Sequence, residues 1–229
     1  MNDPLYWRPM KMLAQAAVIA SVLIFQPTAQ AQTAAHKPGA AFQPARHAVD
    51  AWFDELPGSH RVFVDTASAD GGAEGIGYAN NLYVATESAY AGQRATPAIV
   101  VCFRHFSTPF GFNDAIWAKY GDIIHALLQY PDPMTGGAPK VNLMNSNAHK
   151  MLSNRGVTID ALAAKGTQFA ICNMATQFFA FTVGQQTGRN VNEVHDELVA
   201  NAIKNSHFVS AGVMALTRAQ EYGYSVLIA

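Results

Sequence analysis

The sequence predicts an α/β protein of three layers, in which helices cover both faces of a mainly parallel sheet of about five strands. The principal observation is a pattern that occurs three times: an amphipathic helix, a glycine and a short apolar strand. The glycines are Gly92, Gly166 and Gly223. Glycine readily takes the left-handed conformation that ends many helices. The apolar runs that follow are typical of strands buried on both faces.

Each expected strand is a short apolar run. The strands are expected at residues 61–65, 98–103, 169–172, 206–209 and 224–228. Apolar stripes at helical spacing predict the helices of the repeated pattern, at residues 76–91, 159–165 and 213–222. A short helix around Trp52 and Phe53 is expected to pack at the edge of the domain.

Capping residues indicate where other helices begin. Asn113 or Asp114 can cap a helix after the second strand, and Asn190 begins a segment that resembles a capping box. Ser210 is expected to cap the last helix. Asn173 directly follows the third strand and is expected to begin a helix there.

The glycine-rich segment Asp70-Gly-Gly-Ala-Glu-Gly-Ile-Gly77 lies between the first strand and the first helix of the pattern. A phosphate-binding loop is one interpretation, but the segment matches neither G-x-G-x-x-G nor G-x-x-x-x-G-K-[ST]. Glu74 would also repel a phosphate at the helix start. We therefore expect a tight turn that opens the helix.

The segment from residue 106 to residue 157 predicts a long insertion in the crossover between two strands. Its stretch 131–139 is rich in proline and glycine, which is typical of a surface loop. Long loops at the carboxyl edge of a parallel sheet often cover the binding crevice. We expect residues 59–229 to form one α/β domain around this insertion.

The N-terminus has the three parts of a secretory signal peptide at residues 1–31. Arg8 and Lys11 precede an apolar run at 13–25, and Ala29-Gln-Ala31 is a small-x-small cleavage site. The run is shorter than the roughly 20 residues that span a bilayer, although a retained anchor is the alternative. Residues 32–58 are expected to form a flexible spacer and the short helix. The expected location is periplasmic or secreted, with no membrane span after signal removal.

Composition limits the function classes. The chain has 229 residues, with 15 Lys and Arg against 16 Asp and Glu, and the basic residues are scattered. A nucleic-acid-binding protein would need a basic face, so that class is disfavoured. The histidines lack metal-ligand spacing, and no cofactor or metal is expected.

Ligands of open parallel sheets bind outside the carboxyl ends of the strands. The candidate residues expected at that edge are Asp65, Cys102, Arg104, His105, Cys172 and Asn173. Cys172 ends a strand where a helix is expected to begin, and free N–H groups at a helix start stabilise a thiolate. Cys172 is therefore the candidate nucleophile. The alternative is a cysteine that only fills the core.

Cys102 and Arg104 share one face of their strand, and His105 lies on the other. Arg104 is a candidate for binding a thiol or an anion. A packed Cys102 and a hydrogen-bonded His105 are the alternatives. In an oxidising compartment the two cysteines can also pair, and the sequence leaves that open.

Two segments resemble the DsrE/DsrF-like family. Residues 162–174, which read LAAKGTQFAICNM, are similar to its helix–glycine–strand–cysteine segment, and residues 210–224 are similar to its last helix and following glycine. Residues 104–120 look like exported, uncharacterised members of that family. The resemblance covers roughly residues 60–229, outside the long insertion.

The resemblance implies a homo-oligomeric α/β/α domain in which Cys172 carries sulfur as a persulfide, with a small sulfur species or another small molecule as partner. The alternative is a non-catalytic ligand-binding or assembly module of the cell envelope. Its crevice would be lined by Phe106, Phe110, Phe112, Trp117 and Tyr120.

Overall fold

The computed structural model describes residues 42–93, 95–146 and 150–229. The chain divides into two units, Met1–Gln43 and Pro44–Ala229. The helices and strands described below belong to the second unit. The expected signal peptide at 1–31 and most of the expected spacer lie outside the described residues, so both stay predictions.

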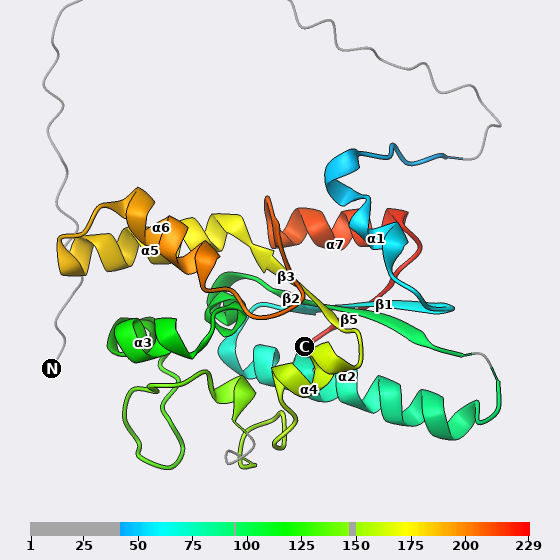
Figure 1. Cartoon of the computed structure of the whole chain (residues 1–229), viewed down its shortest axis with the longest axis horizontal. Helices are drawn as coiled ribbons and strands as arrows, with labels where there is room; N and C mark the ends of the chain where they lie inside the picture. The colour runs from blue at the N-terminus through cyan, green and yellow to red at the C-terminus, as the bar shows by residue number, and fades with distance from the viewer. Residues whose placement is uncertain (1–41, 94, 147–149) are drawn as a thin grey trace, which may run out of the picture. The chain divides into compact units, whose positions relative to one another are not determined.

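The predicted α/β fold with a parallel sheet is confirmed. Five parallel strands follow the order β4-β3-β2-β1-β5 (Figure 1). Their bounds are His60–Thr66 for β1, Pro97–Phe103 for β2, Gln168–Cys172 for β3, Ser206–Val209 for β4 and Ser225–Ile228 for β5. Each expected strand is therefore present, within two residues of its expected ends.

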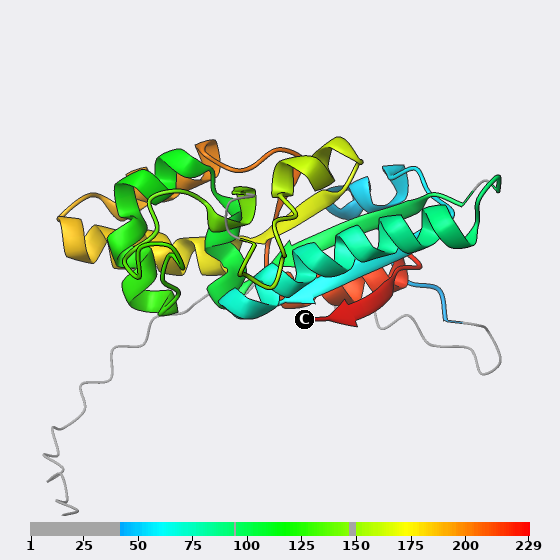
Figure 2. The same ribbon diagram turned by 90° about the horizontal axis from the view of Figure 1, so that it is seen from below.

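Helices lie on both faces of the sheet. Figures 1 and 2 show α2 and α4 on one face and α1 and α7 on the other. The α-helices are α1 Trp52–Glu55, α2 Ala69–Ala89, α3 Asp114–Leu128, α4 Ile159–Ala164, α5 Asn173–Thr187, α6 Val191–Ala200 and α7 Gly212–Glu221. Short 3-10 helices are η1 Ala48–Asp50, η2 His105–Gly111 and η3 Leu143–Asn145.

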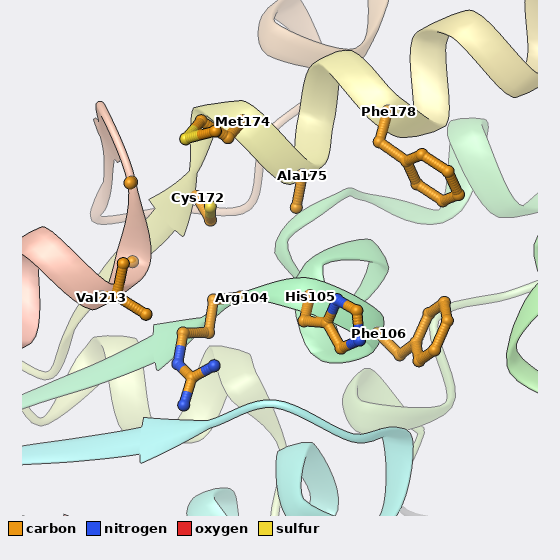
Figure 3. A pocket seen from close by; sticks show the side chains of 10 residues that line it. Arg104, His105, Phe106, Cys172, Met174, Ala175, Phe178 and Val213 are labelled. Carbon is orange, nitrogen blue, oxygen red and sulfur yellow. The ribbon is translucent and has the colours of Figure 1, made fainter.

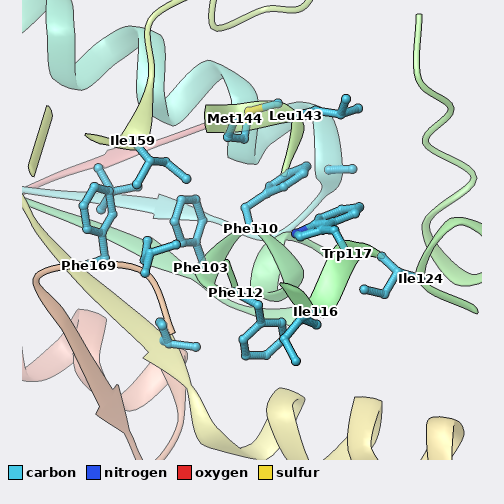
Figure 4. Packing of buried hydrophobic residues seen from close by; sticks show 14 of the residues in the cluster. Phe103, Phe110, Phe112, Ile116, Trp117, Ile124, Leu143, Met144, Ile159 and Phe169 are labelled. Carbon is cyan, nitrogen blue, oxygen red and sulfur yellow. The ribbon is translucent and has the colours of Figure 1, made fainter. Parts of the chain in front are cut away.

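Alternating strand residues form two cores, because successive side chains of a strand point to opposite faces. On the α2 face, strand residues such as Val101 and Phe103 pack with the aromatic residues of the insertion (Figure 4). On the α7 face, Val100 and Cys102 pack with Ala215 and neighbouring side chains. Most residues of the central strands β1, β2 and β3 are consequently buried.

The expected helix ends are confirmed at the three glycines. Gly92, Gly166 and Gly223 have φ angles of +77°, +99° and +82°. Two expected caps are also present, since the side chain of Asn113 accepts from Ala115 N–H and that of Asn190 accepts from the N–H groups of Asn192 and Glu193. These local signals acted as predicted because they depend on neighbours in the sequence.

Two expectations are wrong. The glycine-rich segment 70–77 is not a turn but the first part of α2, which Ser68 caps by accepting from Gly71 N–H. Its glycines permit close packing: a Cβ on Gly72 would lie 2.7 Å from the Phe110 ring, and one on Gly75 would lie 2.6 Å from Thr66 Cγ2. Ser210 does not cap α7, whose N-cap is Ala211.

The crossover between β2 and β3 contains η2, α3 and η3 of the insertion, followed by α4. The helix α3 packs on α5, which pairs with α6. A charged cluster joins α3 to α6: Glu197 contacts Lys119, Arg189 and Tyr120, and the Tyr120 hydroxyl donates to Glu197 Oε2 at 2.8 Å. Burial would raise the pKa of Glu197, but hydrogen bonds from Arg189, Lys119 and Tyr120 outweigh burial and lower that pKa to about 2.

This pKa predicts a pH dependence of stability. A glutamate of the unfolded chain titrates near pH ~4.3, so the ionised Glu197 stabilises the fold fully above that pH and loses its contribution as pH falls toward its folded pKa of about 2. We expect Glu197→Gln to be less stable than the natural chain near neutral pH, with a difference that shrinks in acid. Urea unfolding at several pH values measures it. Asp122→Asn, which removes the exposed partner of Lys140, is the control and should show little change. A stability difference between Glu197→Gln and the natural chain that does not change with pH would contradict this role of the ionised Glu197.

Candidate functional site

A pocket of about 480 Å³ opens at the carboxyl edge of the sheet, where ligands of parallel sheets bind (Figure 3). It lies after β2 and β3 and beside the starts of α5 and α7. The lining residues are Arg104, His105, Phe106, Cys172, Met174, Ala175, Phe178, Ala211, Gly212 and Val213. Three of the six expected site residues, Cys172, Arg104 and His105, are therefore in one pocket.

Cys172 is both the last residue of β3 and the N-cap of α5. Its side chain points into the space between Arg104 and Met174 in Figure 3 and is 7% exposed. Among the described residues, its side chain forms no capping hydrogen bond with α5. A thiol in this position reaches the pocket and lies at the positive end of a 15-residue helix.

Cys102 does not line the pocket. It is fully buried beneath α7, in the core of that face. Burial, together with the nearby Asp65 carboxylate, raises the pKa of the Cys102 thiol well above its usual value. Cys102 therefore stays a neutral, inert thiol, which is the packed alternative considered from the sequence.

The two cysteines are free thiols. Cys102 pairs in register with Ala170, two residues before Cys172 on β3. Adjacent strands lie about 4.8 Å apart and two residues advance about 6.6 Å, so the two Cα atoms are about 8 Å apart. A disulfide needs a Cα separation below roughly 7 Å, so pairing would require backbone movement.

Asp65 and Arg104 form a bidentate ion pair across the ends of β1 and β2. Arg104 Nε and Nη2 donate to the two carboxylate oxygens, each at 2.7 Å. The Asp65 side chain is 2% exposed and the Arg104 side chain 25% exposed. The hydrogen bond to Asp65 raises the pKa of Arg104. Asp65 thus acts on the pocket indirectly, by holding Arg104 in the pocket wall.

The start of α7 packs directly on Arg104. A Cβ on Gly212 would lie 2.5 Å from Arg104 Cβ, so only glycine fits there. Below Arg104, the Ser107 hydroxyl accepts from Arg104 N–H at 3.0 Å, and Thr66 Oγ1 donates to Cys102 O at 2.7 Å. The wall that carries Arg104 is therefore fixed from both sides.

His105 begins η2 on the wall opposite Cys172 and has a φ of +54°. A positive φ is uncommon for residues other than glycine and often marks a functional position. Its ring packs against the Phe106 ring in a tilted arrangement, with centroids 4.3 Å apart and an interplanar angle of 36°. Among the described hydrogen bonds none involves the His105 ring, so the hydrogen-bonded alternative is not seen there.

Asn173 points away from the pocket. Its Oδ1 lies 2.8 Å from Nε2 of His195, so this amide ties the start of α5 to α6. His195 was not recognised from the sequence, because its partner is 22 residues away. Met174, Phe178 and Val213 were also missed. The only sequence signal was the spacing of Met174 and Phe178, which places both on one face of α5.

The aromatic residues expected to line a crevice lie mostly elsewhere. Phe110, Phe112, Trp117 and Tyr120 are buried in the core on the α2 face, and Trp117 Nε1 donates to Pro109 O (Figure 4). Phe106 alone of that set lines the pocket. The insertion therefore supplies one wall residue and a large part of the core.

Comparison with known proteins gave no match among protein-family models, curated proteins or solved structures. The resemblance to the DsrE/DsrF-like family thus stays a prediction. Within the described part of the chain, no three His, Cys, Asp or Glu side chains gather as a metal site would require. Across residues 42–93, 95–146 and 150–229, no helix combines the length and hydrophobicity that a membrane crossing needs.

The buried ion pair predicts a large effect of removing Arg104. Arg104→Ala leaves the Asp65 carboxylate buried without its cation, so we expect the free energy of unfolding to fall by about 3–5 kcal/mol. Lys140→Ala is the control, because its pair with Asp122 is exposed and should contribute less than about 1 kcal/mol. Urea unfolding at neutral pH measures both. If both variants lose the same small amount of unfolding free energy, the pair between Asp65 and Arg104 does not stabilise the carboxyl edge of the sheet.

Proposed function

We propose that this protein is an exported DsrE-like thiol-based sulfur carrier or sulfur-redox protein that acts through Cys172. The observation that carries the proposal is the position of this thiol: of the chain's two cysteines, Cys172 lines the pocket at a helix start and Cys102 is sealed in the core. A carrier needs a thiol that its donor can reach and that water-borne oxidants reach poorly. A side chain 7% exposed at the base of a pocket meets both needs.

The proposed step is transfer of a sulfane sulfur. The Cys172 thiolate attacks the outer sulfur of a persulfide donor, R–S–SH. A new S–S bond forms at Cys172, the donor's S–S bond breaks, and its electron pair leaves on R–S⁻. Cys172 becomes a persulfide and no outside oxidant is required. The thiolate of an acceptor later attacks the outer sulfur of the Cys172 persulfide. The acceptor becomes a persulfide, and Cys172 leaves as a thiolate.

The remaining residues have supporting roles in this proposal. The N-terminus of α5 stabilises the attacking thiolate. Arg104 and His105 contact the donor from the opposite wall. Asp65 positions Arg104, and Asn173 fixes the start of α5 through His195. Cys102 has no part in the chemistry.

Export to the periplasm or the exterior and assembly into a homo-oligomer belong to the same proposal. The first is supported by the signal-like residues 1–31 and the second by the family resemblance. An oxidising compartment makes the recessed position of Cys172 useful, because exposed thiols there are readily oxidised.

A non-catalytic ligand-binding module is the second candidate. The observation that favours it is the apolar character of the pocket, to which Phe106, Met174, Phe178 and Val213 contribute. In that case the thiol of Cys172 would be part of the wall and would form no adduct.

Mass spectrometry distinguishes the sulfur carrier from the non-catalytic binding module. We expect the reduced protein, incubated with benzyl persulfide, to gain the mass of one sulfur atom, and cyanide to remove it. Cys172→Ser should gain none, whereas Cys102→Ala is the matched control and should behave as the natural chain does. Absence of the adduct from the natural chain, or an equal adduct in Cys172→Ser, would rule out the carrier.

A further inference from the structure

We infer that the pocket beside Cys172 selects an apolar organic sulfur compound whose carbon part is uncharged, in preference to an anionic sulfur donor. This inference rests on the proposed function and specifies its substrate class. It depends on the size of the pocket, on its walls and on the pairing of its charged side chain.

The pocket is much larger than the transferred sulfur requires. Its volume of about 480 Å³ lies within the range of cavities that enclose small organic molecules. A carrier that accepted only an inorganic sulfur species would need a far smaller space. The extra volume is therefore available for the carbon part of a donor.

The walls of the pocket are mainly apolar. Met174 and Phe178 extend from α5, Val213 from α7 and Phe106 from η2 (Figure 3). Met174 is 65% exposed, Phe178 48% and Val213 59%. Exposed apolar side chains gathered around one pocket are typical of a binding site, because a ligand that covers them removes apolar surface from water.

The positive charge of Arg104, in the wall of the pocket, is already neutralised by Asp65. Both oxygens of Asp65 bind Arg104, and Asp65 is itself buried. The positive ends of α5 and α7 provide only partial charge. A dianionic donor would bring further negative charge into a pocket whose arginine is paired. An uncharged carbon part avoids this cost.

The test compares two disulfide reagents of matched size on the Cys102→Ala chain, in which Cys172 is the reactive thiol. One is 6,6′-dithiodinicotinic acid, which is a dianion, and the other is its bis-amide, which is aromatic and uncharged. The rate with each reagent is divided by the rate of N-acetylcysteine with the same reagent at the same pH. We expect Cys172 to prefer the uncharged reagent by at least about tenfold over that reference.

Two phenylalanines of α5 provide a matched pair of variants. Phe178 lines the pocket and is 48% exposed, whereas Phe181 lies outside the lining and is 54% exposed. Phe178→Ala should lower the preference by about three- to tenfold, as the loss of one aromatic contact predicts. Phe181→Ala should leave it unchanged.

The outcomes separate the two proposals. The substrate class would be overturned, even if persulfide forms, by either of two results. One is that Cys172 prefers the uncharged reagent no more than N-acetylcysteine does. The other is that the two phenylalanine variants change this preference equally. A retained preference for the uncharged reagent without any persulfide adduct would overturn the carrier function and leave the apolar pocket as a binding site.

Discussion

The ion pair between Asp65 and Arg104 is the interaction on which the carboxyl edge of the sheet depends. It joins the ends of β1 and β2, and the start of α7 packs on the arginine through Gly212. Because a buried carboxylate is costly without its cation, the pair holds Arg104 in one orientation. That orientation forms one wall of the pocket, and the α5 start with Cys172 forms the other. The pocket is thus a consequence of how neighbouring parallel strands end.

The same edge places the two cysteines in different environments. The register aligns Cys102 with Ala170 and leaves Cys172 two residues further along, past the cover of α7. One thiol is consequently sealed and the other opens on the pocket. The apolar side chains around that opening and the paired arginine together suit an uncharged organic donor better than an inorganic anion.

The sequence predicted most of the fold because its signals are local. The glycines Gly92, Gly166 and Gly223 end their helices, and the apolar runs after them are the strands. The prediction failed at segment 70–77 because Gly72 and Gly75 are there to allow close contact with the Phe110 ring and Thr66. Only the folded chain brings these groups near. At the site, strand ends identified Cys172, Arg104 and His105. The partly exposed side chains of Met174, Phe178 and Val213 carried no such signal, and the burial of Cys102 depends on which face α7 covers.

Alkylation of the native protein by N-ethylmaleimide, followed by peptide mapping, shows which of the two thiols the folded chain leaves accessible. We expect Cys172 to be labelled while the protein is folded and Cys102 to be labelled only after unfolding. Labelling of Cys172 only after unfolding would contradict the proposed carrier function, since a thiol closed to a small reagent cannot receive sulfur from a donor.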